Sequence, residues 1–174
     1  MDDRLTVEQS KEVFANLGLA VHASNVLEYA SLHALFTVEM VSKMRSFSSA
    51  AAWEAAYDKF FDEGFSMPFG VIVKRIKATS EFSSELLDLL DTCKVVRNNL
   101  VHHFQRDHAE QIYSEEGRST LISSYENAVA IFDVANNLLE DEVRELQVKF
   151  GVDVDKLSLR IEDEMQKLAR SVPT

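Results

Sequence analysis

Hydrophobic positions along this chain recur at intervals of three and four rather than two. Between residues 121 and 143, one apolar stripe is formed by Leu121, Tyr125, Ala128, Ile131, Ala135, Leu138 and Val143. This spacing places side chains on one face of a helix. Gly and Pro, which interrupt helices, number only 5 and 2 in 174 residues. The pattern therefore predicts an all-α protein, an up-and-down helical bundle of about five to six helices.

Local signals set the expected ends of these helices. The sequence "TVEQ" at residues 6–9 has the form of a capping box, so a first helix should begin near residue 7 and continue through Gly18 or bend there. The segment 19–44 is apolar on nearly every side, which is typical of a central helix. Breaks at "RSFSSAAA", "EGFSMP", "TSEFSS" and 108–117 separate further helices, expected over 50–63, 69–78, 84–104 and 118–150.

Two regions are expected along the chain. Residues 1–150 are predicted to form one helical bundle, and Gly151 is expected to end its last long helix. Apolar residues return at helical spacing over 153–170, so residues 151–174 should form a C-terminal amphipathic helix packed on the bundle or on a partner subunit. A chain of this length can bury a core without disulfides, and its one cysteine, Cys93, can form none internally.

Charge distinguishes one segment from the rest. The net charge is −11, but residues 70–108 carry six Lys/Arg and five Asp/Glu. Because phosphate contacts supply most of the affinity for nucleic acid, a polyanion is expected to dock on that segment only. The amino-terminal residues are polar, and no apolar run approaches the roughly 20 residues that span a bilayer. We therefore expect a cytoplasmic protein without a membrane partner.

The 70–108 segment contains an unusual polar cluster, "VVRNNLVHHF" at residues 95–104. Asn98 and His102 are four residues apart and share a helix face. Arg97 and His102 are five residues apart, about 140° around a straight α-helix. They could converge on one ligand if Arg97 reaches back, if the helix end is distorted, or if two copies of the segment meet across a two-fold axis.

Arginine and histidine together suit phosphate chemistry. Arginine binds phosphate through a planar fork of donors and keeps its charge, whereas histidine takes and gives protons near neutral pH. RNA cleavage needs a base for the 2′-hydroxyl, stabilisation of the phosphate and an acid for the leaving oxygen. A doubled Arg97–His102 pair could supply all three without a metal. Alternatively, Arg97 pairs with a nearby carboxylate such as Asp91, and the histidines face solvent.

The stretch "RNNLVHHF" resembles the signature of the HEPN superfamily. That signature is an arginine, a polar residue that is often asparagine, three more residues and a histidine, late in a helical bundle. Arg97, Asn98 and His102 match it position by position. The order of the expected helices is also similar, with a long apolar helix early, the short helix "FGVIVKRIK" before the motif and a long helix after it. The resemblance covers residues 17–150.

The resemblance implies a homodimer in which the Arg/His turns of both subunits line one cleft. It also implies a metal-independent endoribonuclease of the toxin–antitoxin or phage-defence kind, with Arg97 on the phosphate, His102 as acid/base and Asn98 positioning the site. A cognate antitoxin or a regulatory protein would then be a further partner. Other members are catalytically silent modules that bind a protein or nucleotide partner, which is the alternative function.

Further residues belong to the expected site. His103 leaves open which imidazole acts, and Glu28 is expected to orient a cation, either Arg97 or Arg75. Contacts to RNA are expected from the basic residues of the segment, Lys74, Arg75, Lys77, Lys94 and Arg106.

Neither a metal nor a cofactor is predicted. His22 and His33, with Glu28 between them, lack the cysteine or second carboxylate that would complete a zinc site. An aromatic stripe at Trp53, Tyr57, Phe60 and Phe61 is expected to pack in the core. A third hypothesis, independent of the HEPN resemblance, is an acidic helical adaptor in which the polar cluster is accidental.

Overall fold

The computed structural model describes residues 6–103 and 108–156, and the single residues 159, 163, 166, 167 and 170. This part of the chain contains helices and no strand, so the predicted all-α bundle is confirmed. In chain order the elements are α1 (Val7–Glu39), η1 (Val41–Ser46), α2 (Ala50–Gly64), α3 (Phe69–Thr79), α4 (Ser84–Asn98), η2 (Asn99–His103), η3 (Ala109–Tyr113) and α6 (Glu115–Lys149).

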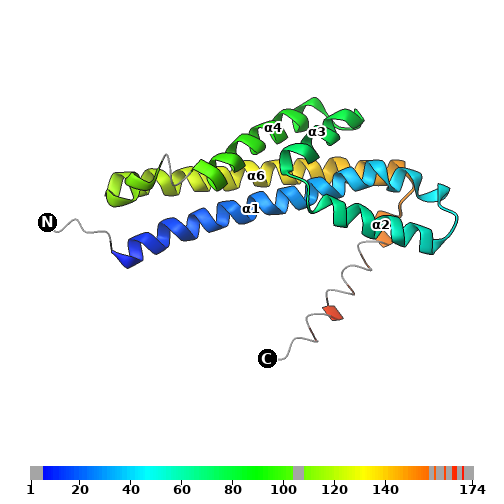
Figure 1. Ribbon diagram of the computed structural model, residues 1–174, viewed down its shortest axis with the longest axis horizontal. Coiled ribbons are helices and arrows are strands. Elements are labelled where there is room, and N and C mark those ends of the chain that lie inside the picture. Colours follow the sequence, from blue (N-terminus) through cyan, green and yellow to red (C-terminus); the bar gives the residue numbers. More distant parts are fainter. Residues whose placement is uncertain are drawn as a thin grey trace.

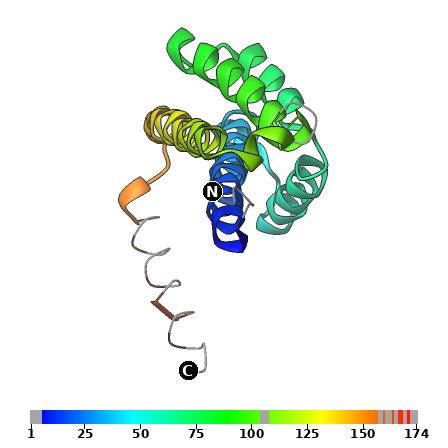
Figure 2. The ribbon, with the colours of Figure 1, turned by 90° about the vertical axis from the view of Figure 1, so that its left-hand side faces the viewer.

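Three helices, α1, α4 and α6, form the body of the molecule (Figures 1 and 2). The two longest, α1 and α6, lie side by side and run in the same direction. Helix α4 is antiparallel to α6. Ser83 at the start of α4 contacts Glu142 near the end of α6, and Asn99, just after α4, lines the same cavity as Ser124 in the first half of α6. Helices α2 and α3 connect α1 to α4, and in Figure 1 they lie in the right half of the view, α2 below the long helices and α3 above them.

Side-chain caps fix where most helices begin. The backbone N–H of Gln9 donates to the Thr6 hydroxyl at 3.2 Å, and the Thr6 N–H donates to the Gln9 side chain at 2.9 Å. The capping box predicted from "TVEQ" is thus confirmed. Ser49, Ser83 and Ser114 accept in the same way from backbone N–H groups at the starts of α2, α4 and α6. Each such cap stabilises a helix by about 1 kcal/mol.

Three helix ends differ from the expectation. Helix α1 continues through Gly18 but ends at Glu39, and a 3₁₀ turn follows where the apolar run was expected to stay helical to residue 44. Helix α6 begins at Glu115 rather than near Arg118, because Ser114 provides its cap. The helix expected over 84–104 changes at Asn99 into η2, a π-helical turn.

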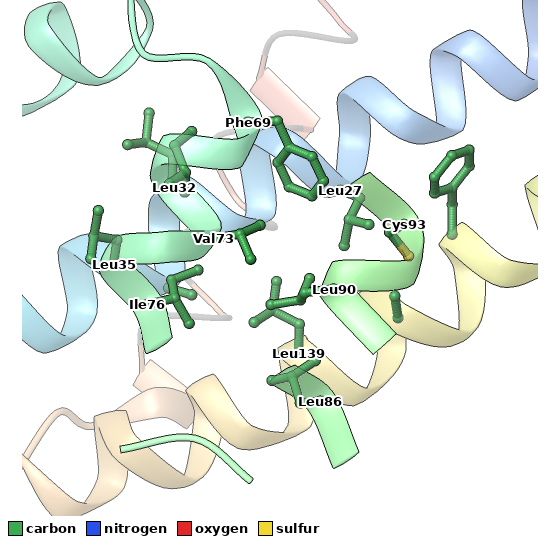
Figure 3. Close-up of a cluster of buried hydrophobic side chains, with 14 of the residues drawn as sticks. Leu27, Leu32, Leu35, Phe69, Val73, Ile76, Leu86, Leu90, Cys93 and Leu139 are labelled. Carbon is green, nitrogen blue, oxygen red and sulfur yellow. The ribbon is translucent and has the colours of Figure 1, made fainter. Parts of the chain in front are cut away.

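The core lies where α1, α3, α4 and α6 meet (Figure 3). Its centre is formed by fully buried branched side chains from each of these helices, among them Leu27, Leu35, Ile76, Leu90 and Leu139. Burying one such side chain contributes about 1.5–3 kcal/mol. The core therefore joins the segment that carries the Arg/His motif to both long helices.

Small residues mark the contact between α1 and α6. The buried positions of α1 include Ala20, Ser24, Ser31 and Ala34. The buried stripe of α6 repeats every seven residues through Tyr125, Phe132, Leu139 and Leu146. Of the predicted α6 stripe, Leu121, Tyr125, Ala128 and Ala135 are buried, but Ile131, Leu138 and Val143 lie only at its margin. Small side chains at the contact between two helices allow them to approach closely.

The chain turns sharply after α6. Gly151 has a φ of 82°, a conformation that glycine adopts without strain, and residues 154–156 are helical again. Most of the C-terminal helix predicted over 153–170 lies outside the described residues. Among the helices that are described, none combines the length and the hydrophobicity needed to cross a membrane.

Candidate functional site

The Arg/His cluster lies where α4 changes into η2. Arg97 and Asn98 are the last residues of α4, and His102 is in the π turn. A π turn has i→i+5 hydrogen bonds and therefore more residues per turn than an α-helix. His102 thus lies less far around the axis from Arg97 than the 140° of a straight α-helix. A distorted helix end is one of the three arrangements by which Arg97 and His102 could converge on one ligand. Such π turns are frequent at functional sites.

Arg97 is held by a carboxylate of α1. Its Nη2 donates to Oε2 of Glu28 at 2.6 Å, across 69 positions of the sequence. The two side chains are 20% and 23% exposed. The expectation that Glu28 orients Arg97 or Arg75 agrees with this contact to Arg97, and Asp91, the other carboxylate considered for Arg97, instead accepts from two lysines.

Arg97 and Glu28 line a cavity of about 370 Å³ between α1, α4 and the corner after α2. We call it the arginine cavity; Asn25, Tyr29, Phe65 and Met67 also line it. The Nε of Arg97 is buried and has no hydrogen-bond partner among the described residues. A guanidinium has five N–H donors, so an oxygen-rich group entering this cavity could accept further hydrogen bonds from Arg97.

The other two motif residues face solvent. Asn98 and His102 are both exposed, and neither is among the described residues that line the arginine cavity. One chain therefore places the motif at one helix end but does not enclose Arg97 and His102 in one cavity. The side chain of His103, and Phe104 as a whole, lie outside what the structure describes.

The basic residues expected to bind RNA have different surroundings. Arg75 is engaged by Glu39, with contacts of 2.5 and 3.2 Å, and its guanidinium lies 6.0 Å from the centre of the Phe60 ring. Lys74 is exposed and has no ion pair within the described part of the chain. Arg106 lies outside the described residues. Lys74 is thus the cation of α3 that is most open to an incoming anion.

Lys77 and Lys94 converge on one carboxylate. Both ammonium groups donate to Asp91, Lys94 at 2.9 Å, and they join α3 to α4. The hydrogen bond from Lys77, and then that from Lys94, hold the pKa of Asp91 below its usual value. Because these side chains are more than a third exposed, the cluster remains accessible to a polyanion.

A second cavity beside the motif was not anticipated from the sequence. It has a volume of about 720 Å³ and lies between the end of α4, η2, η3 and the first half of α6. We call it the polar cavity. Leu121, Tyr125 and Ala128 form its buried floor, and its exposed rim includes Ser119, Thr120, Ser123, Ser124 and Asn127. The sequence feature that could have indicated the polar cavity is the hydroxyl-rich run "RSTLISSYEN" near the start of the longest helix.

The histidines of α1 have other surroundings. His33 packs against the rings of Tyr29 and Phe61, at centroid distances of 4.6 and 4.8 Å, and burial lowers its pKa. His22 is exposed. No group of three or more His, Cys, Asp or Glu side chains within the described residues has the arrangement of a metal site.

The aromatic stripe of α2 packs largely as expected. Phe60 and Phe61 are buried, Trp53 is half-buried, and all three contact the ring of Phe36 on α1. Tyr57 also contacts Phe36 but stays exposed. These rings join α2 to the bundle.

Comparison with known proteins identifies no relative. No protein-family model, curated protein or solved structure matches the chain. The assignment of a function therefore depends on the chemistry of the residues gathered around the end of α4.

Proposed function

We propose that this protein is a metal-independent endoribonuclease of the HEPN type, acting as a homodimer. One observation carries the proposal: Arg97, Asn98 and His102 are clustered at a distorted helix end, with Arg97 anchored by Glu28 and His102 exposed. An anchored cation and an exposed imidazole at one helix end can supply phosphate stabilisation and proton transfer, two of the functions that phosphodiester cleavage uses.

Each residue has a distinct role in the proposed reaction. His102 of one subunit removes the proton from the 2′-hydroxyl, and the 2′-oxygen attacks the neighbouring phosphorus. Arg97 stabilises the added negative charge on the phosphate oxygens. The bond from phosphorus to the 5′-oxygen breaks as a second imidazole donates a proton to that oxygen. Asn98 positions the phosphate, and the products are a cyclic phosphate and a 5′-hydroxyl.

A second subunit is needed because one chain presents a single His102 and does not enclose it with Arg97. Two η2 turns facing each other across a two-fold axis would supply a base, an acid and two guanidinium groups. The cleft would be built from the α4 ends of both chains. In this arrangement His103 is a neighbour of His102 that could substitute for it in part.

The charge of the protein sets how RNA would approach. Most of the chain is acidic, so binding should be weak and should fall steeply as salt rises. Lys74, with Lys77 and Lys94 beside it, forms the proposed docking face. Reversing the charge of Lys74 to Glu should weaken RNA binding more than Lys59→Glu, since Lys59 is an exposed lysine on α2, outside the proposed docking face.

One contact favours the alternative, a catalytically silent HEPN-like module that binds a protein or nucleotide partner. The carboxylate of Glu28 already accepts a hydrogen bond from Nη2 of Arg97 and adds a negative charge to the arginine cavity. A phosphate entering the cavity would be repelled by that charge, so within this alternative the contact favours a protein partner over a nucleotide. Activity in the purified protein separates the two proposals.

The test compares alanine variants of the motif with a matched histidine. Purified protein is incubated with mixed RNA in EDTA, and cleavage is followed on denaturing gels. Arg97→Ala and His102→Ala should each lower the rate by about 10²- to 10⁴-fold, because each removes a group needed in the transition state. His22→Ala, on the exposed side of α1, should leave the rate unchanged.

Circular dichroism must first show that every variant keeps its helices. If folded Arg97→Ala and His102→Ala variants cleave RNA as fast as the unmodified protein, the ribonuclease proposal is wrong. If the unmodified protein itself does not cleave RNA, the silent module takes its place.

The cellular setting belongs to the same proposal. An RNA-cleaving toxin or phage-defence protein would act in the cytoplasm and would be restrained by an antitoxin or regulatory protein. Expression of the unmodified protein should then slow growth of a bacterial host, whereas expression of Arg97→Ala to the same level should not.

A further inference from the structure

Two cavities of opposite character flank the end of α4. The arginine cavity contains an ion pair, Arg97 with Glu28. The polar cavity, on the side that faces α6, has no Asp, Glu, Lys or Arg among the described residues that line it. Among these described residues, a phosphate or a carboxylate would find no counter-charge. The lining instead suits an uncharged ligand with several hydrogen-bonding groups.

Aromatic and amide groups in the polar cavity narrow the class of ligand. The ring of Tyr125 is buried at its floor, and His108 stands at its edge. The amides of Asn99 and Gln111 offer both donors and acceptors, and the Nδ1 of His108 is buried without a hydrogen-bond partner among the described residues. Proteins recognise the unpaired bases of RNA by stacking on accessible aromatic rings, as the partly buried ring of His108 could provide, and by hydrogen bonds to the base edges.

The phenol of Tyr125 adds no charge to the polar cavity. Burial raises the pKa of Tyr125 to about 12, so the group stays protonated throughout the physiological range. A volume of about 720 Å³ is within the range of about 300–1,000 Å³ that is usual for small-molecule sites. The cavity can therefore hold a planar heterocycle together with part of its sugar.

The position of the cavity relates it to the proposed chemistry. Asn99 and Leu100 line the polar cavity and belong to the same π turn as His102. A base held against these residues would place its own sugar and phosphate next to that turn. We propose that the polar cavity is a nucleobase subsite, which selects the RNA nucleotide beside the cleaved bond. This inference rests on the proposed ribonuclease function for its role but not for its test.

Binding can be tested without any cleavage. Isotope-labelled full-length protein is titrated with adenosine, guanosine, cytidine and uridine at millimolar concentration, and amide resonances are followed by NMR. At least one nucleoside should shift the side-chain amide signals of Asn99 and Gln111. Ribose 5-phosphate, which has the sugar and phosphate but no base, should leave them in place.

Two phenylalanine variants of α6 provide the matched comparison. Ser124→Phe fills the polar cavity from its exposed rim, and Ala130→Phe adds the same ring at an exposed position outside it. Ser124→Phe should abolish the nucleoside shifts and lower the rate of cleavage of a short RNA by about tenfold, the range that stacking of one base contributes. Ala130→Phe should change neither.

The outcomes separate this inference from the proposed function. If no nucleoside shifts the amide signals of Asn99 and Gln111, or if the nucleoside shifts are the same in Ser124→Phe and Ala130→Phe, the subsite is wrong even if RNA is cleaved. If nucleosides bind at the cavity of the unmodified protein and Ser124→Phe abolishes this, the subsite stands, even if the catalytic assay fails.

Discussion

The pairing of Arg97 with Glu28 places a charged contact between the surface and the core. Its side chains are 20% and 23% exposed, whereas those of the Lys59–Glu63 pair on α2 are 75% and 66% exposed. Partial burial weakens screening by water, but it also makes an unpaired charge more costly. Removing one partner of the Arg97–Glu28 pair should therefore destabilise the protein more than the attraction alone would suggest.

A double-mutant cycle measures that attraction. With Arg97→Ala, Glu28→Ala and the double variant, urea unfolding should give a coupling energy of about 1 kcal/mol, at the upper end for accessible pairs. The matched cycle on Lys59 and Glu63 should give about 0.3–0.5 kcal/mol, the usual value for exposed pairs one helical turn apart. Equal coupling in both cycles would contradict the anchoring of Arg97.

The stability of the protein should depend on pH through His33. Burial lowers the pKa of His33 below its ordinary value of 6.5, so the unfolded chain binds this proton more tightly than the folded protein. The contribution of His33 is thus fully present above pH 6.5 and is lost as the pH falls below it. The free energy of unfolding should fall by a fraction of about 1.4 kcal/mol per pH unit in that range.

Replacement by a ring that cannot titrate isolates the effect. His33→Phe keeps an aromatic group against Tyr29 and Phe61 and should flatten the pH dependence between pH 7 and 5 in urea titrations. His22→Phe, at an exposed position of the same helix, should leave the slope unchanged. Identical slopes in all three proteins would show that His33 is not the responsible group.

At the scale of single elements, local signals predicted the starts of α1 to α4 and, within one residue, the ends of α2, α3 and α6, but not the ends of α1 and α4. A cap is a contact over three residues, such as Thr6 with Gln9, and the sequence contains all of it. The ends of α1 and α4 depend on distant partners instead. Glu39 at the end of α1 is engaged by Arg75 of α3, and Arg97 at the end of α4 is engaged by Glu28 of α1. Neither contact is visible in a local pattern.

The register of the long helix α6 shows the same limit. Its apolar residues include two adjacent stripes, and the predicted stripe contains Ile131 and Leu138. The structure centres Phe132 and Leu139 instead, one residue further along. Both stripes have helical spacing, so the direction from which α1 approaches decides which is buried. The predicted residues remain in contact with the core as its margin.

Two glycines should respond to alanine with opposite signs. Gly18 lies inside α1 with nothing near its would-be Cβ, so Gly18→Ala should stabilise the protein by about 0.5–1 kcal/mol. Gly151 has a φ of 82°, so Gly151→Ala should destabilise it by about 1–2 kcal/mol. Urea unfolding measures both, and a change of the same sign in the two variants would contradict the assigned conformations.

At the scale of the whole molecule, the sequence indicated which residues form the motif but not how they are enclosed. Glu28 was named as a partner for Arg97 or Arg75, and the choice needed the packing of α1 against α4. The polar cavity arises only where η2, η3 and α6 come together. Spacing along one helix cannot predict a volume bounded by several elements.

The proposed composite site requires a stable dimer. Light scattering at micromolar concentration should give about twice the 19.7 kDa mass of one chain. An obligate interface usually buries more than about 2,000 Å², so the dimer should persist on tenfold dilution. A mass of one chain under both conditions would exclude a cleft shared between two subunits, while leaving the nucleoside titration interpretable.

The contact between the first and last long helices also determines when the protein can fold on the ribosome. More than 100 residues lie between Leu35 of α1 and Leu139 of α6, which meet in the same core. At a synthesis rate of about 5–20 residues per second, roughly 5–20 s pass between the synthesis of α1 and that of the part of α6 that packs on it. During that time the part of its apolar surface that packs on α6 is exposed on the nascent chain. Aggregation or capture by a chaperone should therefore compete with folding until α6 has emerged.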